Sequence, residues 1–231
     1  MQRREFLRLC AASAAAAGTP ALAADARPRL YDRARLARPD GTPLRAGDVP
    51  ANRNLIFHYP YAATPCFLIN LGRPSAATVM LKTVDDQPYV WRGGVGATHS
   101  IVAYSAICAH RMTYPTREIS FISYRSGKSP GDRFDNVIHC CSEHSQYDPA
   151  AGGRVLAGPA PQPLAAILLE YDARDDSLTA VGTLGGEMFA QFFDKYAFRL
   201  ALEGQNQPRR EVRGTAVVTA LENYCRQQVK C

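Results

Sequence analysis

Short runs of apolar and β-branched residues, separated by turn residues, make up most of the chain beyond residue 54. These runs are typical of strands and lie at 66–71, 77–84, 100–107, 118–124, 134–141, 164–171 and 177–183. Glycine and proline mark the turns between them, at 72–74, 93–94 and 126–132. Many short strands joined by such turns predict an all-β protein, built as an antiparallel β-sandwich.

Both ends of the chain depart from this pattern. Residues 25–54 are rich in Pro, Arg and Asp, which predicts an extended arm or linker before a β domain at 55–185. Residues 186–203 have the spacing of an amphipathic helix, and a polar stretch and a short strand or helix follow. The segment 186–231 is therefore predicted to be a C-terminal helical extension, and it is a candidate for docking on a partner.

The first 24 residues have the character of a targeting segment. Arg3 and Arg4 precede Phe-Leu, an alanine-rich stretch follows, and 21–23 resembles a small-residue cleavage site. This arrangement resembles a twin-arginine export signal, which implies a periplasmic protein and a segment that is not part of the fold. The apolar run is broken at 18–20 and falls short of the roughly 20 apolar residues of a membrane span. Membrane association is therefore not favoured.

Two short motifs carry the candidate chemistry: Cys108-Ala109-His110 and Cys141-Ser142-Glu143-His144. Each offers one thiolate and one imidazole within a single turn, and four such ligands on two loops can hold a metal centre. In a Rieske-type [2Fe–2S] cluster two histidines replace two cysteines on one iron. A loop pair of the form Cys-x-His and Cys-x-x-His is usual in that family. From about residue 95 to residue 169 the chain therefore resembles a Rieske iron–sulfur protein.

Residues beyond the second motif strengthen this resemblance. Tyr147-Asp148 follows His144, and Gly158-Pro159-Ala160-Pro161 is close to the family's third loop, which covers the cluster. Prolines stiffen such a cover because they fix φ and remove N–H donors. The resemblance implies a Rieske-like sandwich with a cluster-binding subdomain and one [2Fe–2S] cluster per chain. It also implies that Cys108 and Cys141 bind one iron, and that His110 and His144 bind the other, exposed iron.

Other metal chemistries fit less well. Two cysteines and two histidines also form a zinc set, but zinc sites usually group like ligands together, whereas each loop here mixes them. His58, His99 and His139 are interpreted as structural, with His139 packed on a strand. No histidine follows His144, so the chain lacks the ligands for the second, mononuclear iron of a Rieske oxygenase. The sequence predicts electron transfer rather than catalysis by this chain alone.

The chain departs from the family in three places. The positions that match the family's inter-loop disulfide are Thr113 and Glu143, so that disulfide is missing. The segment between the two motifs is long enough to hold an inserted hairpin, either as decoration or for docking a partner. The stretch after His144 is one residue short, which leaves open the register of Ser145 and Tyr147, the candidate hydrogen-bond donors to the cluster.

The cysteines outside the two motifs and residues 1–24 are Cys66, Cys140, Cys225 and Cys231. In an oxidising compartment the simplest pairing is Cys225 with Cys231, which would leave Cys66 and Cys140, but sequence alone does not decide. Cys140 is an alternative cluster ligand that lacks the x-x-His spacing.

The function that follows is a periplasmic Rieske electron-transfer protein or the small subunit of an oxidoreductase. Its partner would be a cytochrome c or a larger oxidoreductase subunit. The alternatives are the Rieske subunit of a quinol–cytochrome c oxidoreductase and, in another class, a non-redox zinc-binding or redox-sensing module. The net charge of +6 falls to +4 without residues 1–24, a slight basic excess that an acidic redox partner would favour. No motif suggests a nucleic-acid partner.

Overall fold

The computed structural model describes residues 27–127, 133–203 and 206–231. The predicted export signal lies outside these residues. Within the described part of the chain, no helix has the length and apolar character needed to cross a membrane.

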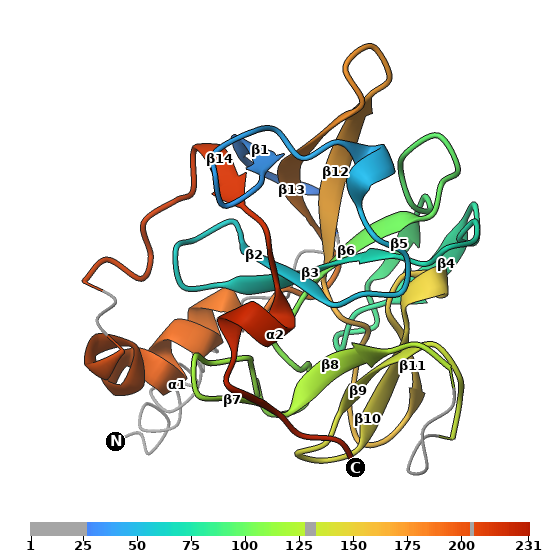
Figure 1. Cartoon of the computed structure of the whole chain (residues 1–231). Coiled ribbons are helices and arrows are strands. Elements are labelled where there is room, and N and C mark those ends of the chain that lie inside the picture. Colours follow the sequence, from blue (N-terminus) through green and yellow to red (C-terminus); the bar gives the residue numbers. More distant parts are fainter. Residues whose placement is uncertain (1–26, 128–132, 204–205) are drawn as a thin grey trace, which may run out of the picture.

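An eight-stranded sheet forms the body of the molecule, in the order β14-β1-β13-β12-β6-β3-β2-β15 (Figure 1). Its strands are β1 (Arg29–Ala37), β2 (Leu55–His58), β3 (Pro65–Asn70), β6 (Ile101–Ser105), β12 (Ala166–Asp172), β13 (Ser177–Leu184), β14 (Gly214–Val217) and β15 (Thr219–Ala220). Neighbours run antiparallel, except that β1 and β14 are parallel. The sheet curls until β14 meets β2 and encloses a core that includes Leu36, Phe57 and Leu68.

A separate four-stranded antiparallel sheet lies at the lower end of the view in Figure 1, in the order β11-β10-β9-β8. Its strands are β8 (Ile122–Arg125), β9 (Val137–Cys140), β10 (Ser145–Asp148) and β11 (Arg154–Ala157). Two short pairs complete the β structure, β4 (Val79–Lys82) with β5 (Pro88–Trp91) and β7 (Ile119–Ser120) with β16 (Gln227–Gln228). Two 3₁₀ turns, η1 (Ala46–Asp48) and η2 (Pro149–Ala151), lie in the connections.

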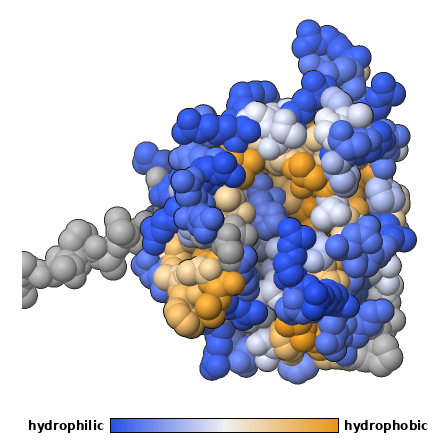
Figure 2. Space-filling view, turned by 60° about the vertical axis from the view of Figure 1, so that its left-hand side comes forward, coloured by the Kyte–Doolittle hydropathy of each residue, from blue (hydrophilic) through white to orange (hydrophobic). Residues whose placement is uncertain are grey.

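The helix α1 (Phe189–Leu202) packs against the loop that carries the first motif. It buries Phe189, Phe192, Phe193 and Leu200, whose spacing places them on one face. These side chains meet Ile107 and Tyr114, which flank Cys108 and His110 in the sequence. Figure 2 turns this side of the molecule toward the viewer and shows hydrophobic residues among polar ones on its surface. A second, short helix, α2 (Leu221–Tyr224), follows β15.

The structure confirms the all-β class, the small sheet at one end and the C-terminal helix. Each run predicted as a strand overlaps an observed strand, and α1 falls within the predicted range. The inserted segment does form a hairpin, β8 with β9. In place of two stacked sheets, however, the predicted sandwich is formed by one curled eight-stranded sheet.

Both terminal segments contribute strands to the large sheet, which differs from the prediction of an arm and an appended extension. β1 lies between β13 and β14 because Ala34 and Leu36 alternate with Arg33 and Arg35. The small apolar residues face the core, while the arginines face outward and pair with acidic residues of the neighbouring chain segments. β14 and β15 return to the sheet beside β1 and β2. The two segments that were expected to lie outside the β domain therefore supply strands of its large sheet.

Candidate metal centre

The first motif occupies a tight loop after β6. The N–H of Cys108 donates to the carbonyl of Thr113 at 2.8 Å, and the N–H of Met112 donates to the carbonyl of Cys108 at 2.8 Å. These two bonds fold the chain back and fix the position of His110 between them. The ring nitrogen Nδ1 of His110 is buried and has no hydrogen-bond partner among the described residues. A buried polar atom without a partner is costly, so this nitrogen is available as a metal ligand.

The second motif forms the turn between β9 and β10, in which Cys140 pairs with Ser145 across the hairpin. Side chains of paired strands alternate between the two faces of a sheet. One face carries Ile138, Cys140, Ser145 and Tyr147. The opposite face carries His139 and Gln146. The first face turns toward the first motif, since Ile138, Cys140 and Tyr147 share one buried core with Cys108.

Each of the two loops contributes one thiol to a buried pair. Cys108 and Cys140 are hydrogen-bonded to each other, and they are 1% and 0% exposed. The Tyr147 hydroxyl accepts the N–H of Ala109 at 3.2 Å and lies 3.2 Å from the sulfur of Cys108. Since this oxygen already accepts one bond, its proton is free to point at the sulfur.

Backbone amides also surround both sulfurs. The N–H groups that point at the Cys108 sulfur belong to His110 and Arg111. Those that point at the Cys140 sulfur belong to Ser142 and Glu143. The Cys140 thiol, the Tyr147 hydroxyl and the amides together lower the pKa of Cys108 below its usual value, against the effect of burial. Donors that converge on buried sulfur in this way stabilise a thiolate, the form that binds metals.

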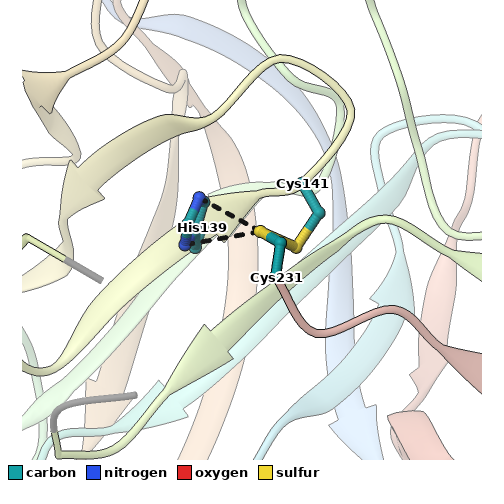
Figure 3. A group of neighbouring side chains, drawn as sticks. All are labelled: His139, Cys141 and Cys231. Atoms are coloured by element: carbon teal, nitrogen blue, oxygen red, sulfur yellow. Dashed lines mark hydrogen bonds between the residues drawn. A yellow bond between two sulfur atoms is a disulfide. The ribbon is translucent and has the colours of Figure 1, made fainter. Parts of the chain in front are cut away.

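Cys141 is not part of this thiol pair, and the prediction that it supplies the second free thiolate needs correction. It forms a disulfide with Cys231, with a Cα–Cα distance of 5.7 Å (Figure 3). The physical reason is alternation: Cys141 follows Cys140 directly and turns its side chain toward the opposite face, where the C-terminus lies.

The predicted pairings of the remaining cysteines are also wrong. Cys66, Cys140 and Cys225 are free and buried. The Cys225 thiol donates to the carbonyl of Gln227 at 2.9 Å, and the Cys66 thiol to the carbonyl of Tyr59 at 2.9 Å. Each of these two thiols thus has a backbone partner in place of a second sulfur.

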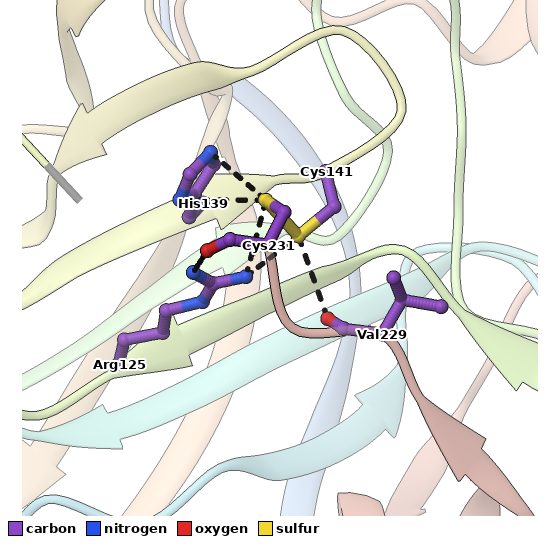
Figure 4. Close-up of a disulfide and its surroundings, with 5 residues drawn as sticks. All are labelled: Arg125, His139, Cys141, Val229 and Cys231. Atoms are coloured by element: carbon purple, nitrogen blue, oxygen red, sulfur yellow. Dashed lines mark hydrogen bonds between the residues drawn. A yellow bond between two sulfur atoms is a disulfide. The ribbon is translucent and has the colours of Figure 1, made fainter. Parts of the chain in front are cut away.

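Charged and aromatic groups surround the disulfide, as Figure 4 shows. Arg125 of β8 places Nη2 2.6 Å from the sulfur of Cys141 and donates from Nη1 to the carbonyl of Cys231 at 2.9 Å. His139, predicted only to pack on a strand, lies with Nε2 3.5 Å from the sulfur of Cys231. His139, Cys141 and Cys231 have metal-ligating atoms within 4.8 Å of one another, but the S–S bond removes both thiolates from that set.

An ion pair joins the two loops. Arg111 Nη1 lies 3.2 Å from Glu143 Oε1, and each residue adjoins one of the predicted histidine ligands. On the helix side, Lys195 of α1 donates to the carbonyl of Arg111 at 2.7 Å. Tyr114 meets Phe192 of α1 edge-on at 4.9 Å between ring centroids. The first loop therefore packs on α1, which the sequence predicted only as a C-terminal extension.

The predicted third loop does lie over the second motif. Gly158 has a φ of 87°, and a Cβ at this position would come within 2.5 Å of the carbonyl oxygen of His144. Only glycine permits this approach. His144 itself is exposed and has a left-handed backbone, with a φ of 57°. The third loop thus covers the backbone of His144, while the side chain stays on the surface.

The predicted hydrogen-bond donors lie beside the two buried thiols. Tyr147 reaches the sulfur of Cys108, as described above. Ser145 is fully buried beside Cys140, and its hydroxyl has no hydrogen-bond partner among the described residues. Two buried thiols, an unpartnered imidazole nitrogen and an unpartnered hydroxyl fit the donor set of an iron–sulfur centre with mixed cysteine and histidine ligands. Cys140 was not among the predicted ligands.

Fold and site together define the class: an all-β protein with a candidate cysteine–histidine metal centre on two loops at one end. No family model matches the chain. Among solved structures, it is similar to the soluble domain of the Rieske protein II (soxF) from Sulfolobus acidocaldarius. The two chains are 26% identical with a TM-score of 0.46, over 66% of this chain and 78% of that one.

Proposed function

We propose that the protein is a Rieske-type electron-transfer protein with one [2Fe–2S] cluster. His110 and His144 would supply the imidazoles, Cys108 one thiolate, and the second loop the other. The observation that carries this proposal is the buried pair of thiols, Cys108 and Cys140, on two loops of which the first also holds the buried, unpartnered Nδ1 of His110. When bound, such a cluster supplies a one-electron redox couple.

The residues of the chain would tune and protect that couple. Burial of Cys108 and Tyr147 excludes water from one side of the site. The Tyr147 hydroxyl, the Ser145 hydroxyl and the backbone amides of both loops supply donors to sulfur. Donors of this kind stabilise added negative charge, favour the reduced state and raise the midpoint potential. His144 is exposed, so it offers the surface at which a partner exchanges electrons.

The partner we propose is a cytochrome c or a larger oxidoreductase subunit in the periplasm. The twin-arginine-like segment at residues 1–24 supports export of the folded protein, because that route carries proteins that have already bound their cofactor. The basic excess supports an acidic face on the partner. A quinol–cytochrome c complex has less support, since residues 1–24 make a weak anchor.

The test is an EPR spectrum of the purified full-length protein after reduction with dithionite, together with iron, sulfide and zinc analysis. We expect a rhombic signal with the low average g-value that histidine ligation gives, and two irons and two sulfides per chain. A colourless, EPR-silent protein that contains zinc would refute electron transfer and favour the zinc-binding alternative, since two cysteines and two histidines also suit that metal.

A further inference from the structure

The second loop offers two adjacent cysteines, and only one can be a cluster ligand. We propose that Cys140 is the second cluster thiolate, and that Cys141 belongs to a disulfide with Cys231 that fastens the loop to the C-terminus. This inference rests on the proposed function for the ligand, whereas the disulfide can be tested without it.

Strand alternation separates the two sulfurs. Cys140 is the last residue of β9, and its side chain lies on the face that meets Cys108. Cys141 begins the turn and turns toward the face of His139, where Cys231 lies. To bring Cys141 to Cys108, β9 would have to slip by one residue against β10, and every side chain of β9 would then change faces. That slip would move Ile138 to the face that now carries His139 and would place the imidazole of His139 in the apolar core beside Tyr147.

The sulfurs of Cys140 and Cys141 have different surroundings, and these suit a cluster ligand and a disulfide, respectively. Cys140 is completely buried, next to Cys108 and the unpartnered hydroxyl of Ser145. Two backbone amides point at its sulfur. Cys141 is half-buried, and its sulfur faces the guanidinium of Arg125 at 2.6 Å and the carbonyl of Val229 at 3.5 Å (Figure 4). The Cys141 side chain therefore contacts the C-terminal tail rather than the thiol pair.

The turn accommodates the longer spacing that this assignment needs. Three residues separate Cys140 from His144, against two between Cys141 and His144. The hairpin closes with Cys140 opposite Ser145, so the turn holds four residues. The left-handed backbone of His144 returns the chain to β10, and Gly158 packs on its carbonyl. The additional residue thus lies in the turn, and β10 still presents Ser145 and Tyr147 to the site.

The C-terminal tail is built to deliver Cys231 to this point. β16 pairs with β7, and the N–H of Val229 donates to the carbonyl of Ser120 at 2.8 Å. Arg125 then binds the carbonyl of Cys231 itself. These contacts lead the last residues along β7 to β8, so one role of the inserted segment is to bind the C-terminal tail of the chain. The disulfide gives the second loop a covalent anchor, while the family's inter-loop disulfide is missing.

Serine variants of the full-length protein separate the two cysteines. We expect Cys140→Ser to contain at least ten-fold less iron and acid-labile sulfide per chain than the wild type. A Cys141→Ser and Cys231→Ser double variant should keep the content of the wild type, because it removes the disulfide without leaving a lone thiol. Cys225→Ser is the matched control for loss of a buried thiol outside the site. Far-UV circular dichroism of each variant checks that it is folded.

Peptide mapping of the wild type tests the disulfide independently. The protein is denatured in alkylating reagent without reductant, and fragmentation between residues 140 and 141 locates each modification. We expect Cys141 linked to Cys231 and Cys140 alkylated. Cys140 in a disulfide, or a double variant that loses its cluster while Cys140→Ser keeps it, would overturn the proposal. Wild-type protein without iron and sulfide would instead overturn the proposed function and the ligand assignment, and the mapped link would still decide the disulfide.

Discussion

Replacement of Tyr147 by phenylalanine is the sharpest test of how the loops tune the proposed cluster. The hydroxyl lies 3.2 Å from the sulfur of Cys108 and accepts the N–H of Ala109 at 3.2 Å. Phenylalanine keeps the buried ring and removes this donor. A hydrogen bond to a charged group contributes about 1.5–3 kcal/mol. Reduction adds charge to the acceptor, so we take about 1 kcal/mol of this as the difference between the two oxidation states.

For a one-electron couple, a tenfold change in the equilibrium constant, or about 1.4 kcal/mol, corresponds to about 59 mV. Tyr147→Phe should therefore lower the midpoint potential by about 40 mV, measured by a redox titration followed by EPR. The control is Tyr104→Phe, which loses a buried bond of 2.8 Å to the carbonyl of Pro149 but touches neither sulfur. A potential within about 10 mV of the wild type for Tyr147→Phe would refute this reasoning, as would an equal shift in Tyr104→Phe.

Other expected outcomes test the supports of the site and of the fold. Gly158→Ala should release bound iron faster than Gly41→Ala, measured with a ferrous chelator, because Gly41 has a similar positive φ but open space around it. Phe192→Ala, on the buried face of α1, should lower the free energy of unfolding in urea by about 3–5 kcal/mol. Phe198→Ala should lower it by almost nothing, because Phe198 is 78% exposed. Burial, with a smaller effect of the charge of Arg117, lowers the pKa of His58 to about 4. In this pH range His58 binds a proton in the unfolded chain but not in the folded chain. The free energy of unfolding therefore decreases by at most about 3 kcal/mol as the pH is lowered from about 6.5 to 4. His58→Gln should remove that part of the pH dependence, and parallel curves for the two proteins would contradict it.

The magnitudes indicate which contacts hold the second loop in place. The ion pair between Arg111 and Glu143 is 64% and 35% exposed at its side chains, so it contributes about 0.2–1 kcal/mol. The disulfide spans a sequence separation of 90 residues. In the chain-entropy account, a loop of that size stabilises the fold by about 4.5 kcal/mol. The C-terminal tail is therefore a stronger support for the second loop than the ion pair that joins the two loops.

Local pattern was sufficient for much of the architecture. The β-runs, their turns and the amphipathic spacing of α1 each depend on neighbouring residues, and each predicted run overlaps an observed strand or helix. The same holds for Gly158, because its place in the Gly-Pro-Ala-Pro loop identified a cover before its contact with His144 was known. The arm at 25–54 was misjudged because charged residues outnumber the alternating Ala34 and Leu36, whose burial depends on β13 and β14.

The choice between the adjacent cysteines was decided by tertiary structure. The sequence by itself determined that two loops would bring cysteine and histidine together, and that Tyr147 would follow the second loop at a short distance. It contained one signal for Cys140: the stretch after His144 is one residue short, and counting to Tyr147 from Cys140 instead of Cys141 restores that residue. Adjacent strand residues face opposite sides, and only the pairing of β9 with β10 and the path of the C-terminus fix which side meets Cys108. Those are long-range contacts, which no local pattern of residues encodes.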